Sequence, residues 1–173
     1  MLKSVRQFFQ SIFLRVSKED IKAFDQYLNI GEHALFMQLP EYEKVHAILT
    51  AKKMQKLVHS IPDVNERKMV RAALLHDVGR ISGKVNLFDK VWLKLAKYFL
   101  PPVYHRLAAR GQRPGSKFKK FYVHKHHGEV AGEFLKRAGT DKDIIELIVK
   151  HTDKTRPSDP KELSLLRQAD RTS

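Results

Sequence analysis

The stretch Ala72–Arg80 limits the possible fold of this chain more than any other part of the sequence. Four apolar residues are followed by the adjacent pair His76 and Asp77, and then by Gly79 and Arg80. Histidine and carboxylate are good ligands for first-row metals, but neighbouring residues cannot lie on one face of a regular helix. Gly79 is a typical helix stop signal. We therefore expect a helix that ends at this pair, where the backbone can turn both side chains toward one ion.

Apolar residues recur at helical spacing along the rest of the chain, without a convincing strand pattern or an internal repeat. Helices are expected over residues 2–15, 17–31, 42–58, 63–76, 86–100, 121–137, 141–151 and 161–170. Ser17 predicts one helix start and Gly31 the stop of that helix. The pair Pro101-Pro102 closes the helix over residues 86–100, in which Trp92 is expected to pack. The predicted fold class is all-α.

Length and composition favour one globular domain. The chain has 173 residues, of which 42% are hydrophobic, and it contains no cysteine. The lack of cysteine excludes thiolate sites and is compatible with a reducing cytosol. No apolar run approaches the roughly 20 residues of a membrane span. The first residues lack a long apolar core and a cleavage site, so we expect no secretion signal and a cytoplasmic location.

The formal net charge of +14 favours anionic partners, although the chain could also be basic without any such partner. Phosphorylated small molecules, nucleic acid and an anionic membrane surface all fit this charge. Residues 2–15 form either a basic amphipathic helix on a membrane or a first helix packed on its own domain. Residues 105–125 are strongly basic around a loop marked by Gly111, Pro114 and Gly115. This stretch is an excursion between helices that is either plain surface or attracts an anion.

Six ligand-type residues lie at expected helix ends or beside apolar stripes. They are His46, His76, Asp77, His127, His151 and Asp170. Four histidines and two carboxylates suit one or two first-row metal ions. Asp77 could bridge two ions because its carboxylate has two oxygens.

The order of these residues resembles that of the HD-domain metal-dependent phosphohydrolases. The segments that carry the resemblance are Leu74–Arg80, His127–Leu135, Ile145–His151 and Leu166–Asp170. The resemblance covers roughly residues 30–173 and implies an HD-domain helical bundle. It leaves residues 1–29 as an N-terminal helical extension packed on that domain. The implied activity is hydrolysis of a phosphate ester or anhydride, with a nucleotide as the expected substrate.

The resemblance also implies roles for individual residues. His46, His76, Asp77 and Asp170 would bind a first metal ion. Asp77 would bridge to a second ion held by His127 and His151. The expected ions are Fe or Mn, with Zn, Co, Ni and Mg as alternatives. Asp77 and Asp170 would orient the attacking water. The residues expected to hold the substrate phosphate are Arg80, Lys84, His124 and Lys125.

Three positions depart from the family pattern. Arg80 stands where lysine is frequent, and a planar guanidinium does not freely replace a point charge. Gly128 stands where proline is frequent, and Ala131 where glycine is usual. These departures leave His124 as an alternative to His127, and the residues after His127 favour the latter.

Three functions fit this sequence. The first is a metal-dependent phosphohydrolase or phosphodiesterase. The second is a protein on the HD fold that senses a nucleotide without hydrolysing it, although a full ligand set argues against this. The third is a nucleic-acid-binding protein whose affinity would fall steeply with salt.

Overall fold

The structure is a computed structural model that describes residues 17–173, so the helix expected over residues 2–15 lies outside the described residues. The helices are α2 (Lys18–Asp25), α3 (Ile30–Met37), α4 (Glu41–Val58), α5 (Glu66–Leu75), the 3-10 helix η1 (Val78–Gly83), α6 (Leu87–Phe99), α7 (Pro101–Gly111), α8 (Lys119–Arg137), α9 (Lys142–Lys150) and α10 (Lys161–Thr172). Residues 17–173 contain no strand, and the all-α prediction is confirmed.

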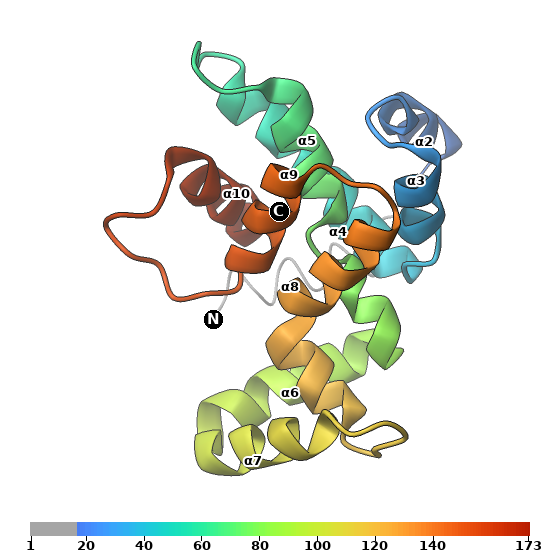
Figure 1. Ribbon diagram of the computed structural model, residues 1–173, viewed down its shortest axis with the longest axis vertical. Helices are drawn as coiled ribbons and strands as arrows, with labels where there is room; N and C mark the ends of the chain where they lie inside the picture. The colour runs from blue at the N-terminus through green and yellow to red at the C-terminus, as the bar shows by residue number, and fades with distance from the viewer. Residues whose placement is uncertain (1–16) are drawn as a thin grey trace.

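The main core lies where α4, α5, α9 and α10 meet, with α8 running along it (Figure 1). Its largest fully buried side chains include Met54, Met69, Leu74, Ile148 and Leu166. Helices α2 and α3 cover one side of this core, through the buried rings of Phe24 and Phe36 in particular. The division at residue 30 into an extension and a domain stays a prediction.

A second, smaller core holds α6 and α7 against the first half of α8, at the lower end of the molecule in Figure 1. It consists of Val85, Leu93, Ala96, Tyr104 and Val123, with two partly buried aromatic rings beside them. The antiparallel pair α6–α7, residues 87–111, is called the hairpin below.

The helix predicted over residues 17–31 is wrong at its end. Ser17 does cap a helix, since its Oγ accepts from the backbone N–H of Asp20 at 3.0 Å, but α2 stops at Asp25. Gly31 lies inside α3 instead of ending a helix. A new helix begins there because Asn29 and Glu32 form a reciprocal capping box, which satisfies two N–H groups at the start of α3.

Two predictions for residues 86–125 also need correction. The helix ends before Pro101 as expected, but Pro101 also opens α7, because the first position of a helix needs no N–H donor. Gly111 is the last residue of α7, not part of the loop. Trp92 contacts the ring of Phe121 on α8 but is not buried, since it is 58% exposed, and Leu95 and Phe99 on the same helix are exposed as well.

None of the helices within residues 17–173 combines the length and the apolar character that crossing a bilayer requires.

Candidate metal centre

The junction between α5 and η1 places His76 and Asp77 together. His76 ends α5 with nearly helical angles, whereas Asp77 has φ −104° and ψ 4° and starts η1. This change of backbone direction lets two adjacent side chains face one point, as expected from the sequence. Gly79 has a different role from the predicted one. It lies within η1, where a Cβ would come within 2.0 Å of the carbonyl oxygen of His127, so glycine allows η1 to contact the backbone of α8.

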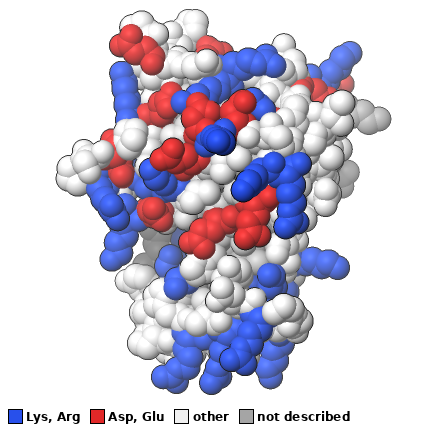
Figure 2. Space-filling view, viewed as in Figure 1, with Lys and Arg blue, Asp and Glu red and all other residues white. Residues whose placement is uncertain are grey.

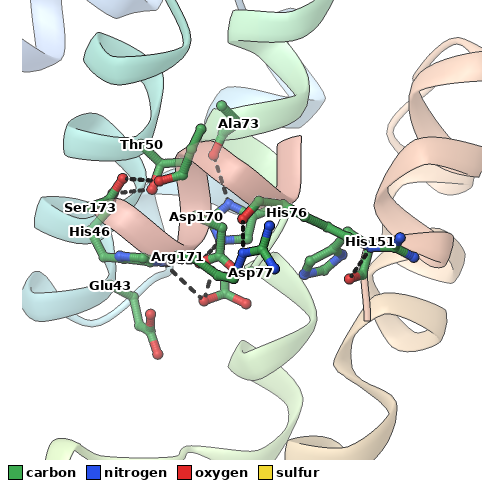
Figure 3. Close-up of polar contacts among 12 residues, drawn as sticks. Glu43, His46, Thr50, Ala73, His76, Asp77, His151, Asp170, Arg171 and Ser173 are labelled. Atoms are coloured by element: carbon green, nitrogen blue, oxygen red, sulfur yellow. Dashed lines mark hydrogen bonds and ion pairs between the residues drawn. The ribbon is translucent and has the colours of Figure 1, made fainter. Parts of the chain in front are cut away.

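The structure brings all six sequence-predicted ligand residues together. His46 lies in the second turn of α4, His127 follows a kink of α8, His151 ends α9, and Asp170 lies near the end of α10. The kink is at His126, with φ −118° and ψ 22°. Figure 3 shows the side chains from α4, α5, α9 and α10 converging around Asp77. We call the six residues the cluster.

One half of the cluster surrounds Oδ2 of Asp77. Nε2 of His46 lies 3.0 Å from Oδ1 of Asp170 and 3.9 Å from Oδ2 of Asp77. Nε2 of His76 lies 3.6 Å from the same Asp77 oxygen and 3.5 Å from Oδ1 of Asp170. These atoms surround a point that a single cation could occupy.

The other half of the cluster lies at Oδ1 of Asp77. Nε2 of His127 is 3.2 Å from this oxygen, and the ring centroids of His127 and His151 are 5.2 Å apart. Asp77, His127 and His151 offer ligand atoms within 4.8 Å of one another, and so do His46, His76 and Asp77. The two groups share Asp77, whose two oxygens face different groups.

Backbone carbonyls orient three of the four histidines in the same way. Nδ1 of His76, His127 and His151 lies 2.8, 3.2 and 2.5 Å from the carbonyl oxygen three residues earlier. A carbonyl can only accept, so Nδ1 carries a proton, and Nε2 is the nitrogen that can give its lone pair to a metal ion when the ring is neutral. Nε2 of His76 is buried without any hydrogen-bond partner. This nitrogen faces the carboxylates of Asp77 and Asp170, which favour a cation at that point, either a proton on the ring or a metal ion in its place.

Helix ends supply the carbonyls that hold His76 and His151. The last carbonyls of a helix lack an N–H partner of their own helix, so a side chain can donate to them. At the end of α9, Arg167 supplies further donors, with Nη2 bonding the carbonyl of Lys150 at 2.7 Å and Nε that of His151 at 3.2 Å. Arg167 is itself buried, so the end of α9 and the ring of His151 are held in place.

Burial and charge set the protonation of the cluster. Burial lowers the pKa of His151 to about 3, and burial together with the charge of Arg80 also lowers the pKa of His127. Burial opposes the protonation of His76, but the charges of Asp77 and Asp170 outweigh it and raise the pKa of His76 to about 9. Positive neighbours hold the pKa of both carboxyl groups well below the usual range despite their burial. The negative charges of Asp77 and Asp170 therefore favour a cation at the point between these two carboxylates and His76.

A family comparison agrees with this geometry. The model of the HD domain matches residues 45–173, about three quarters of the chain and all six cluster residues. This chain belongs to the HD-domain family. HD domains bind divalent metals and are in general metal-dependent hydrolases. Searches of curated proteins and of solved structures return no match to this HD domain.

Arg80 of this HD domain is buried beside the second half of the cluster. Its Nε lies 2.8 Å from Oδ1 of Asp77, and its Nη2 donates to Nε2 of His127 at 3.4 Å. Burial disfavours the charged guanidinium, but Asp77 and Glu43 outweigh this effect and raise the pKa of Arg80. Arg80 therefore brings a permanent positive charge to the atoms that a second metal ion would use.

Sequence reasoning missed two charged residues beside the cluster, Glu43 and Lys90. Glu43 is fully buried one turn before His46, and its Oε1 lies 3.6 Å from Nε of Arg80. Nζ of Lys90 reaches from α6 to within 3.0 Å of Glu43 and 3.9 Å of Oδ2 of Asp77. The three-residue spacing before His46 is a signal that could have found Glu43. No local signal marks Lys90, because α6 approaches the cluster only in the folded chain.

The other residues predicted to hold the substrate phosphate, namely Lys84, His124 and Lys125, do not belong to the cluster. His124 is outside both ligand groups, and its Nδ1 is 2.6 Å from the hydroxyl of Tyr104. Burial and nearby positive charges lower the pKa of His124 to about 3. Lys84 is exposed at the end of η1, and Lys125 is partly buried on α8. Within residues 17–173, neither lysine makes an ion pair with a cluster residue.

Proposed function

We propose that this HD domain hydrolyses a phosphate ester or anhydride of a nucleotide with a water activated by two metal ions. The observation that supports this most is the common orientation of His76, His127 and His151. Each ring gives its Nδ1 proton to a backbone carbonyl and thereby keeps Nε2 for a ligand near Asp77. Such outer hydrogen bonds fix the tautomer of metal-binding histidines.

The ligands divide between the two oxygens of Asp77. One ion would be held by His46, His76, Asp77 and Asp170, and the other by Asp77, His127 and His151. Imidazole with carboxylate suits Fe or Mn, with Zn, Co, Ni and Mg as alternatives. The same types of ligand would also suit a single ion held by His46, His76, Asp77 and Asp170 alone.

Bound divalent ions supply an activated water at neutral pH and neutralise charge on phosphoryl oxygens. The chain itself orients the reactants. The side chain of Asp170 is 34% exposed, against 2% for Asp77, so Asp170 can accept a hydrogen bond from an incoming water. The buried Asp77 lies between the two groups of ligands, with one oxygen near His76 and the other near His127. Arg80 and Lys90 then provide cations for the phosphate, since their nitrogens lie 2.8 and 3.9 Å from the carboxylate oxygens of Asp77.

Lys84, His124 and Lys125 remain candidates for a more distant phosphate of the nucleotide. His124 is the least suited to this role as an ion partner, because its low pKa keeps the ring neutral. A neutral imidazole bonded to Tyr104 can still contribute one hydrogen bond.

A nucleotide-binding protein without turnover is the second candidate. The position of Arg80 favours it, because the guanidinium already occupies the side of Asp77 and His127 where a second ion would sit. A chain with one ion and Arg80 in that place could bind a phosphate without hydrolysing it.

The deciding experiment combines metal analysis with an activity panel. The full chain is purified without chelator, its ions are counted, and Mn- or Fe-loaded protein is tested on nucleoside phosphates, dinucleoside polyphosphates and cyclic dinucleotides. We expect His76→Ala and Asp77→Ala to lose both metal and turnover. His59→Ala, an exposed histidine at the end of α4, is the matched control. Near-normal turnover in His76→Ala would refute the site, and tight binding without hydrolysis would select the second candidate.

A further inference from the structure

Helix α6 has an apolar face that is largely exposed within residues 17–173. Phe88, Trp92, Leu95 and Phe99 are 80, 58, 49 and 67% exposed. Their spacing of four, three and four residues places them on one side of the helix. The opposite side carries Leu93, which is buried in the smaller core. Helix α6 is therefore apolar on two sides. One side packs in the smaller core, and the other stays largely exposed within residues 17–173, with one edge contact between the rings of Trp92 and Phe121.

The exposed apolar surface continues around the end of the hairpin. Tyr98, Leu100 and Val103 are 68, 53 and 48% exposed. Of the ten large hydrophobic side chains exposed within residues 17–173, eight lie between residues 88 and 103. Scattered exposed hydrophobic residues are normal, but a cluster of this size marks an interaction surface.

Positive charge is concentrated in the same part of the chain. Residues 84–125 contain eleven lysines and arginines against one acidic residue, Asp89, and so account for +10 of the net charge of +14. In Figure 2 basic side chains gather at the lower end of the molecule, where the hairpin lies, and the acidic side chains lie above it. The exposed apolar residues of the hairpin therefore lie in the most positively charged part of the molecule.

The turn between α7 and α8 adds a basic recess. Arg110, Arg113 and Lys117 line an open hollow of about 520 Å³ together with Phe118. The three cations are exposed, and none of them is a cluster residue. The recess can therefore receive an anionic group without involving the metal centre.

We propose that the α6–α7 hairpin docks on a lipid bilayer that contains anionic lipid. The apolar side chains of α6 would enter the boundary between headgroups and acyl chains, with Trp92 and Tyr98 at the level that such rings prefer. The surrounding lysines and arginines would contact the lipid phosphates. The residues of this surface are not those of the segment 2–15, for which the sequence left membrane contact as one of two alternatives.

The chemistry of the surface argues against two other occupants. Single-stranded nucleic acid stacks its bases on aromatic rings, but aliphatic side chains such as Val91 and Leu95 would gain nothing from it. Protein interfaces are poor in lysine, whereas this surface is rich in it. Only a bilayer with negative headgroups matches both the apolar face and the basic rim.

Docking in this way leaves the metal centre intact. Lys90 lies on the side of α6 that faces Glu43, and Asp89 pairs with Lys120 of α8 at 2.6 Å. No cluster residue belongs to the docking face. The proposal therefore stands or falls independently of the hydrolase function, while α6 itself links the bilayer surface to the region beside Asp77.

Trp92 provides a direct test because it is the only tryptophan of the chain. The full chain is titrated with phosphatidylcholine vesicles, with and without phosphatidylglycerol, and its emission is followed together with sedimentation. We expect a blue shift and quenching by brominated acyl chains only with anionic vesicles, weakened by salt. Leu95→Glu with Phe99→Glu should weaken binding by about tenfold or more, as should Arg106→Glu with Arg110→Glu. Ile30→Glu, at a 92% exposed position on α3, is the matched control.

Circular dichroism and metal content verify the fold of each variant. If Leu95→Glu with Phe99→Glu does not fold, the test rests on Arg106→Glu with Arg110→Glu. The absence of any shift with anionic vesicles would overturn the proposal. Binding that survives both hairpin variants but is lost in Phe8→Glu with Phe9→Glu would assign the contact to residues 2–15 instead. A blue shift that depends on protein concentration without lipid would assign the surface to a second copy, and a shift with RNA but not with vesicles would assign it to nucleic acid.

Discussion

Arg80 donates from Nη2 to Nε2 of His127, at 3.4 Å, across the space beside Oδ1 of Asp77. The same guanidinium lies 2.8 Å from that oxygen through its Nε. A second metal ion would use the lone pair of His127 and the same Asp77 oxygen. The guanidinium of Arg80 would therefore compete with a second ion for this position and, once displaced, could contact a phosphate.

Replacement of Arg80 should separate its competition with a second metal ion from its contact with a phosphate. Arg80→Gln removes a buried positive charge beside the second group of ligands, so we expect the affinity for a second Mn ion to rise roughly tenfold, or about 1.4 kcal/mol. Turnover should fall because the phosphate loses a cation. Calorimetric titration with Mn measures the first effect. Lys136→Gln, an exposed position with the same change of charge, is the control, and an unchanged second affinity would show that Arg80 does not compete.

The two neighbouring histidines of α8 should behave differently. His127→Ala should bind one ion fewer and lose turnover by about a hundredfold or more, because several kcal/mol of charge stabilisation depend on the second ion. His124→Ala should keep its ions. It leaves the hydroxyl of the buried Tyr104 without its partner, so the free energy of unfolding of this variant should fall by about 1–3 kcal/mol. Metal analysis and urea unfolding of both variants make the comparison, and loss of an ion in His124→Ala alone would reverse the assignment.

A methyl group at Gly79 should displace α8. Its Cβ would lie 2.0 Å from the carbonyl oxygen of His127 and 2.7 Å from the backbone nitrogen of Ala131. Backbone atoms cannot move aside as a flexible side chain can, so Gly79→Ala should cost about 1–3 kcal/mol or more. It should also weaken the second metal more than the first. Gly115→Ala, in the loop after α7, has space for a Cβ but a φ of +71°, so it controls for general strain without contact to the cluster.

The stability of the hairpin should depend on pH through Asp89. Burial raises the pKa of this carboxyl, but the ion pair with Lys120 and the backbone N–H of Asn86 together outweigh it and place the pKa below its ordinary value of 3.8. A lowered folded-state pKa gives stability that is present above 3.8 and lost as the pH falls through the folded value. Asp89→Asn should therefore cost roughly 0.5–1 kcal/mol at neutral pH and almost nothing near pH 2. Denaturant unfolding at both pH values measures this, and an equal cost at both would exclude the charge as the cause.

Local patterns predicted most of the helices because their signals lie in adjacent residues. Asn65 caps α5 where the sequence places a start, and the buried Leu163, Leu165 and Leu166 of α10 follow the expected spacing. The exception at Gly31 has the same local origin, since the capping box of Asn29 and Glu32 competes with the stop signal. Trp92 was misplaced for a different reason, because apolar spacing shows which side of a helix is apolar but not whether another element covers it.

The sequence by itself determined the helical class and the order of the six ligand-type residues, since periodicity and motif spacing are properties of the chain alone. Only the tertiary structure decided that His127, not His124, joins the cluster, because a kink at His126 and the contact with Gly79 set the direction of α8. It also decided that Arg80 points at His127 and that Lys90 reaches Glu43. Such contacts depend on how separate helices pack, and packing is the sum of many weak interactions between residues far apart in the chain.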